Sequence, residues 1–305
     1  MPVLKHFWVS LTLLMLLCVS FLPGRAQMAR LYTTESGLPN SQINHICQDS
    51  RGFIWISTEN GLARFDGRDF VTFRYSRDHA GGLASDLVLG VFEDRCGTVW
   101  VGTSMGLQIF DPDNLSFRSV DLGDPSSPGS TQHISSIIEV RTGPSRSELW
   151  VATSQHGIYI LDMQTYALRD ERRSLISQNL PSGFIYKLFQ DSRGRVWIAG
   201  ETGGLTVVDP ETLAPCGLRM EPSEAIRHLS EDPASGNILM ATRNGLYIYD
   251  ASTDAIRPSS DPRARQCEAD CLLPDHFIQR AGERTFLVGT ETEGLLIYDL
   301  TADRL

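Results

Sequence analysis

Seven polar side chains lie where the sequence predicts loops, and their types suit the binding of a sugar or a cation. Imidazole, carboxylate, amide and guanidinium groups can hydrogen-bond to sugar hydroxyls, and imidazole and carboxylate are also metal ligands. His133 and His156 are the most suggestive pair, with Glu201 as a candidate third metal ligand. The alternative interpretation is that all are solvated residues in loops that vary freely. The candidate ligand-binding set is Asn60, Asp86, His133, His156, Glu201, Arg243 and Glu291.

No recognisable catalytic motif occurs in the sequence. It has no nucleophile elbow, no glycine-rich phosphate loop and no HExxH zinc motif. The Asp box of sialidases, Asp-x-Gly-x-x-Trp, is echoed at Asp49-x-x-Gly52-x-x-Trp55, with one extra residue in the spacing. An Asp box stabilises a turn, so this similarity favours a propeller fold and does not indicate sialidase activity. We assign no catalytic residue, metal or cofactor, and keep a lyase or glycosidase as the alternative.

Two of the cysteines, Cys267 and Cys271, lie close together in a segment that reads as a loop. They are placed to form a local disulfide, and with His276 they would supply three zinc ligands. No fourth ligand is nearby, so unpaired thiols or one disulfide are favoured over a metal site.

Residues 1–26 have the pattern of a secretory signal peptide. Lys5 precedes an apolar run from Phe7 to Leu22, and small residues at Gly24 and Ala26 suit cleavage after Ala26. The run is interrupted by Ser and Thr and is short for a spanning helix, which disfavours a retained membrane anchor. The sequence therefore predicts an exported chain over residues 27–305.

The composition is that of a globular protein with an acidic surface. The 305 residues are 41% hydrophobic and carry a net charge of −10. A protein that binds nucleic acid through phosphate contacts would instead be basic, so a nucleic-acid partner is disfavoured.

The candidate loops lie within a pattern that recurs six times. "WIST" at Trp55 returns as "WVGT", "WVAT", "WIAG", "LMAT" and "LVGT", at intervals of 45, 50, 47, 42 and 48 residues. A Gly and an aliphatic residue follow each time, and then an apolar residue and Asp. A period of this length in short strands is typical of a β-propeller. The repeats are centred on Trp55, Trp100, Trp150, Trp197, Leu239 and Leu287.

Each repeat reads as four antiparallel strands, here called a to d. In the first repeat we expect strands at Ile43–Gln48, Phe53–Ser57, Gly61–Phe65 and Phe70–Tyr75, because these runs are β-branched and aromatic between turn formers. "DSRG" suits the a–b turn, with Asp bonding back to the backbone and Gly at positive φ. It occurs at Asp49 to Gly52 and at Asp191 to Gly194. Asp66, Asp111 and Asp209 suit the c–d turns.

The b strands are apolar on both faces, which predicts that each sheet is covered by two others. The Trp of each repeat would fill the wedge between sheets. No segment has apolar residues at the spacing of a helix, so we expect no helix in place of these strands. We expect residues 31–34 to add a fourth strand to the last sheet, giving an all-β propeller of six blades.

The stretch "GLPNSQINHICQDSRGFIWISTENGLARFDG" (37–67) resembles the two-component regulator propeller repeat. The resemblance covers six units from about Arg30 to Leu300, most closely in the first, second and fourth. It implies the periplasmic sensor region of a hybrid histidine kinase, with an oligosaccharide as typical ligand and no enzymatic activity of its own. Family members usually carry two propellers, often of seven blades, followed by an immunoglobulin-like domain, a transmembrane helix and kinase domains, so this chain can also be part of a seven-bladed propeller. A free-standing interaction scaffold is a further alternative.

Overall fold

The computed structural model describes residues 31–77, 81–123, 132–180, 184–201, 204–218, 225–267, 269–274, 284–290 and 294–305. Residues 34–305 form one compact unit, and of the residues before it only 31–33 are described. In these ranges, no helix is both long and apolar enough to cross a bilayer.

The larger unit contains six antiparallel sheets, numbered here as blades 1 to 6 in chain order. Blades 1, 2 and 5 have four strands each. They are β1(Ile43–Gln48), β2(Ile54–Thr58), β3(Gly61–Phe65) and β4(Phe70–Phe73); β5(Val88–Glu93), β6(Val99–Thr103), β7(Gly106–Asp111) and β8(Ser116–Val120); and β15(Ile226–Glu231), β16(Ile238–Thr242), β17(Gly245–Asp250) and β18(Ala255–Pro258).

Blades 3, 4 and 6 have three described strands each. They are β9(Ile134–Gly143), β10(Arg146–Thr153) and β11(Ile158–Asp162); β12(Ile185–Gln190), β13(Val196–Gly200) and β14(Leu205–Val208); and β19(Ala269–Pro274), β20(Thr285–Thr290) and β21(Gly294–Asp299). In the first repeat the strands agree with the predicted ones to within two residues.

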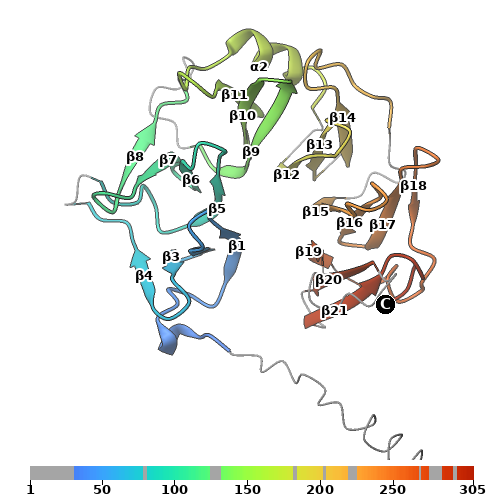
Figure 1. Ribbon diagram of the computed structural model, residues 1–305, viewed down its shortest axis with the longest axis horizontal. Coiled ribbons are helices and arrows are strands. Elements are labelled where there is room, and N and C mark those ends of the chain that lie inside the picture. Colours follow the sequence, from blue (N-terminus) through green and yellow to red (C-terminus); the bar gives the residue numbers. More distant parts are fainter. Residues whose placement is uncertain are drawn as a thin grey trace, which may run out of the picture. The chain divides into compact units, whose positions relative to one another are not determined.

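The sheets stand around a common centre, with the first strand of each innermost (Figure 1). The inner strands contact one another in chain order, from β1 through β5, β9, β12 and β15 to β19. This arrangement confirms an all-β propeller in which each of the six repeats builds one blade.

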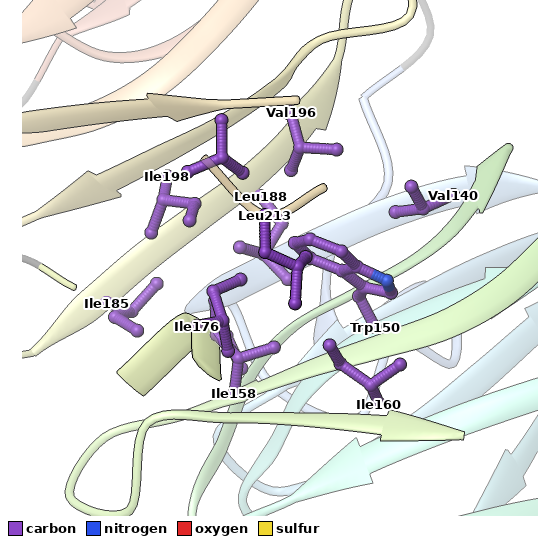
Figure 2. Packing of buried hydrophobic residues seen from close by; sticks show 12 residues of the cluster. Val140, Trp150, Ile158, Ile160, Ile176, Ile185, Leu188, Val196, Ile198 and Leu213 are labelled. Carbon is purple, nitrogen blue, oxygen red and sulfur yellow. The ribbon is translucent and has the colours of Figure 1, made fainter. Parts of the chain in front are cut away.

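The core lies in the wedges between successive blades. Figure 2 shows the wedge between blades 3 and 4, where Trp150 packs among Ile158, Ile160, Leu188 and Val196. The b strands β6, β13 and β16 are buried along their whole length, as expected for strands covered on both faces. The indoles of Trp55, Trp100, Trp150 and Trp197 are all 0% exposed.

Polar bonds also join successive blades at the end of the inner strands. In each, a side-chain oxygen on the inner strand of one blade accepts a backbone N–H of the blade before it, which comes from the a–b turn in blades 1, 2 and 4 and from β9 in blade 3. The four inter-blade links run from Ser50 to Glu93 (2.6 Å), from Arg95 to Glu139 (3.0 Å), from Arg141 to Gln190 (2.9 Å) and from Ser192 to Glu231 (2.9 Å).

The two end blades present apolar side chains on their outer faces. In blade 6, Leu287 occupies the place of the wedge Trp but is only half-buried, and its cross-strand partner Ile297 is 45% exposed. In blade 1, Ile46 is 57% exposed. These side chains face outward because no described blade covers them.

The outer strand of blade 3 is replaced by a helix, contrary to the expectation of no helical segment. Helix α2(Asp170–Ser177) buries Ile176 in the wedge beside Trp150. Arg172 fixes it by pairing with Glu148 (3.0 Å) and by donating to the carbonyl of Glu211 (3.1 Å) on blade 4. Tertiary contacts of one Arg and one Ile therefore decide the conformation of a polar segment.

One other expectation was wrong. Residues 31–34 do not form the predicted strand, because Thr34–Ser36 is the 3-10 helix η1 and residues 31–33 have no regular structure. Cys267 is buried in the wedge between blades 5 and 6, where its Sγ lies 3.3 Å from the carbonyl oxygen of Ala264. Unpaired thiols and a local disulfide stay the alternatives for Cys267 and Cys271, because the side chain of Cys271 and residue His276 lie outside the described part of the chain.

Candidate functional site

The a–b turns are built around a carboxylate, as the "DSRG" pattern predicts. Asp49 Oδ1 accepts the backbone N–H groups of Arg51 (3.0 Å) and Phe53 (2.9 Å), and Oδ2 accepts the indole N–H of Trp55 (2.9 Å). Gly52 has φ +89°, which a side chain rarely adopts. The turn, the strand and the wedge Trp are thus tied to one buried side chain.

The same constellation occurs in two further blades. Asp191 accepts the indole N–H of Trp197 at 2.8 Å, with Gly194 at φ +86°. Asp94 does the same for Trp100 at 2.8 Å. Asp94 was not among the predicted turn residues, although the spacing Asp94-x-x-Gly97-x-x-Trp100 repeats that of the first unit. In blade 3 the acceptor is instead Glu148, at 3.2 Å from the indole nitrogen of Trp150.

The predicted ligand-binding loops gather at the opposite end of the blades, called here the rim. The rim consists of the b–c turns and the residue before each inner strand. Backbone bonds join the two within one blade, from Glu59 to Gln42, Ser104 to Leu87, Ser154 to His133 and Glu201 to Phe184. Loops that are far apart in the sequence are therefore adjacent at the rim.

His133 and His156 line one cavity of about 350 Å³ at the rim. This rim cavity spans three blades, with Ser104 from blade 2, Ser154 and Gln155 from blade 3 and Phe184 from blade 4. The ring of Phe184 is 42% exposed. An aromatic ring beside several small polar groups is the usual lining of a site for an amphipathic ligand.

The imidazole of His133 is kept neutral by its surroundings. Burial lowers the pKa of His133, and its Nδ1 is buried without a hydrogen-bond partner in the described part of the chain. A neutral imidazole has one donor and one acceptor nitrogen, so it can bond to a hydroxyl of a bound molecule. A buried atom without a partner in a cavity is a candidate contact for a ligand.

The other candidates do not join this cavity. Asn60, Arg243 and Glu201 are exposed at the rim, and Glu291 lies outside the described residues. Asp86 is used in the fold, because its Oδ1 accepts the backbone N–H of Tyr75 (2.7 Å). Among the described residues, no three His, Cys, Asp or Glu side chains are placed to hold a metal ion.

A larger cavity, of about 740 Å³, lies between the inner strands of blades 1 to 4 and reaches Glu231 of blade 5. We call it the channel cavity. Its polar lining includes His45 on β1, Ser135 on β9 and Lys187 on β12. None of these three residues was predicted to belong to a site.

Comparison with protein families supports the interpretation of the repeats. Residues 37–60, 82–105 and 179–202 match the family described as "Two component regulator propeller". These segments belong to blades 1, 2 and 4, the repeats with the closest fit to the pattern. No curated protein matches the chain.

Solved structures share the fold. The extracellular domain of the hybrid two-component system BT3049 from B. thetaiotaomicron is 24% identical, with a TM-score of 0.72 over 90% of this chain. That of the one-component system BT4673 from the same organism is 22% identical, with a TM-score of 0.67 over 87% of it. PorZ, a surface component of the type-IX secretion system of Porphyromonas gingivalis, is 16% identical, with a TM-score of 0.54 over 84%. This chain spans 36%, 36% and 38% of those structures, respectively.

Proposed function

The chain carries two-component regulator propeller repeats, and on this basis we propose that it is an exported sensory propeller of a two-component system of the hybrid histidine kinase type. It binds a ligand such as an oligosaccharide and relays the signal to domains outside this chain. The observation that carries the proposal is the match of three blades to this family. The extracellular domains of BT3049 and BT4673, which share the fold, support it.

The partners of this propeller follow from the same comparison. Because the chain spans only 36% of the BT3049 and BT4673 structures, we infer a second propeller or downstream signalling domains as its partners. Attachment to a membrane would come through such segments. We infer that residues 1–26 are a signal peptide, and export then predicts that the protein in a periplasmic fraction begins at Gln27. N-terminal sequencing checks this, and a retained Met1 would contradict it.

The rim cavity is the proposed ligand site. Phe184 offers a flat face to the C–H side of a sugar ring, and Ser104, Ser154 and Gln155 offer hydroxyl and amide groups to its hydroxyls. His133 adds a neutral imidazole. Of the predicted set, His133 and His156 are therefore the strongest candidates, and Asn60, Asp86, Glu201, Arg243 and Glu291 are proposed as weaker ones.

Thermal-shift screening and calorimetry with a panel of oligosaccharides test this proposal. We expect at least one glycan to raise the melting temperature of the wild type. Phe184→Ala and His133→Asn should weaken its binding about tenfold, because each removes one contact of the order of 1 kcal/mol or more. Met105→Ala is the control, since Met105 is exposed at the rim and does not line the cavity.

The outcomes separate the alternatives. A folded protein that responds to no glycan in a broad panel contradicts the proposal. Cleavage of a bound glycan would instead favour a lyase or glycosidase. Specific capture of a periplasmic protein without any glycan response would favour an interaction scaffold.

A further inference from the structure

Each inner strand carries an irregularity at the same point. The pairing with the second strand skips one residue in every blade, between Ile43 and His45 in β1, and equivalently in β5, β9, β12, β15 and β19. Such a bulge re-aims the neighbouring side chains and is common beside functional sites. In blades 1 to 5, the residues that follow the skipped position are His45, Gly90, Ser136, Lys187 and His228.

Buried polar atoms without partners gather around the channel cavity. His45 and Ser135 line the cavity, and neither His45 Nδ1 nor Ser135 Oγ has a hydrogen-bond partner in the described residues. The same is true of Nδ1 of His228, which lies on the neighbouring β15 and outside the lining of the cavity. Folded proteins rarely leave such atoms unpaired, so two of them in one cavity call for a bound group.

Blade 4 contributes a lysine to the lining of the same cavity. Lys187 lines the channel cavity, and its charge lowers the pKa of both His45 and His228, second in each case to burial. The electrostatic effect of His45 lowers the pKa of His228 further. The three basic groups, from three blades, are therefore near neighbours. Lys187 is also the only lysine after Lys5, whereas the chain has 25 arginines, because lysine and arginine together number 27.

The carboxylates of the channel cavity are engaged elsewhere. Glu139 pairs with Arg95 (3.6 Å), Glu231 accepts from Ser192, and Asp191 accepts from Arg195 and Trp197 (both 2.8 Å). Among the described residues, no carboxylate contributes to the pKa shift of His45 or His228. Lys187 and three arginines line the cavity together with these three carboxylates, and this excess of positive charge attracts an anion.

We propose that the channel cavity binds a small oxyanion, held by Lys187, His45 and Ser135 of its lining and by His228 on the neighbouring strand. The ammonium of Lys187 supplies the charge, and the imidazole N–H groups and the hydroxyl of Ser135 donate hydrogen bonds to the anion's oxygens. A carboxylate, a phosphate and a sulfate share this chemistry. A metal cation fits poorly, because Lys187 would repel it. The site is separate from the rim cavity and goes beyond the sensory function proposed above.

Titration of the full protein with phosphate, sulfate and glucuronate tests this site. Sodium chloride at equal ionic strength controls for screening. We expect at least one of the three anions to raise the melting temperature beyond the chloride control, and the anion that does so identifies the source of the oxyanion. Lys187→Met should weaken that binding by about tenfold or more, because it removes a charge-assisted bond. Arg68→Met removes one positive charge from an exposed turn, and its response should match the wild type.

A second measurement needs no variant. In protein labelled with ¹³C at the lysine ε-carbon, Lys187 gives the only signal after the leader, and it should shift on titration with the anion that binds. A wild type that responds to none of the anions, an unshifted Lys187 signal, or an undiminished response in Lys187→Met would overturn the proposal. Because Phe184 and His133 line only the rim cavity, Phe184→Ala and His133→Asn should leave the anion response intact.

Discussion

The indole nitrogen of Trp55 lies 2.9 Å from Asp49 Oδ2, so the largest side chain of the wedge is bonded to the turn that precedes its strand. The relationship recurs six residues apart at Asp94 and Trp100 and at Asp191 and Trp197. One residue type thus fixes both the local turn and the packing between blades.

Replacing Asp49 by Ala should destabilise the protein substantially. Three N–H donors lose their acceptor, and each buried unpaired donor costs about 1–3 kcal/mol. We expect the free energy of unfolding, measured by urea denaturation, to fall by roughly 3 kcal/mol or more. Asp66→Ala is the matched control, because Asp66 makes a similar turn at an exposed site. Equal losses in the two variants would show that the bond to Trp55 contributes little.

The two leucines that replace the wedge Trp, Leu239 and Leu287, should contribute differently to the free energy of unfolding. Leu239 is 0% exposed between blades 5 and 6, so Leu239→Ala should cost about 2–5 kcal/mol. Leu287 is only half-buried on the outer face of blade 6, and Leu287→Ala should cost about 1 kcal/mol. Denaturation of both variants measures the difference. If Leu287→Ala costs as much as Leu239→Ala, that outer face is covered in solution.

Acid should weaken the fold through the channel histidines. Burial and then Lys187 lower the pKa of His45 to about 4 from the ordinary 6.5. Between these values the unfolded chain binds a proton at His45 that the folded chain does not, so the free energy of unfolding falls as the pH drops from 6.5 to 4. The contribution of His45 is up to roughly 3 kcal/mol.

Urea denaturation at a series of pH values checks this, with His45→Gln for comparison. The variant should show a flatter pH dependence, and the slope that is left comes from His228 and His133, whose pKa values are lowered too. Parallel curves for the wild type and His45→Gln would contradict the prediction. Cys47 also faces this region, and burial raises the pKa of its thiol, so it stays uncharged over the interval.

Thiol labelling should distinguish the cysteines by burial. Cys96 and Cys216 are exposed and should react with iodoacetamide in the native protein, Cys216 more slowly because burial raises its pKa. Cys267 should react only after unfolding in denaturant. Peptide mass spectrometry reads out each site. Protection of Cys267 in denaturant that is lost on adding a reductant would instead indicate a disulfide.

The sequence predicted the blades well because their signal is local. Strand b is apolar throughout, and "DSRG" specifies its turn through one Asp and one Gly. Helix α2 was missed because its residues are mostly polar, and its place depends on the distant partners of Arg172. The channel residues were missed for a different reason. His45, Lys187 and His228 each stand third in their inner strands, "INHICQ", "IYKLFQ" and "IRHLSE", a column that is visible only when the repeats are aligned.

The four inter-blade links give the junctions from blade 1 to blade 5 the same kind of bond. A repeat copied or inserted by gene duplication would bring its own acceptor, as Glu93, Glu139, Gln190 and Glu231 do, and so would fasten itself to the preceding blade. Gln48 holds this position on blade 1, and its amide is already tied to its own turn at Gly52, as that of Gln190 is at Gly194. Blade 1 therefore already carries a side-chain acceptor for a blade placed before it. The propeller can thus be extended by whole blades that use the same kind of inter-blade bond.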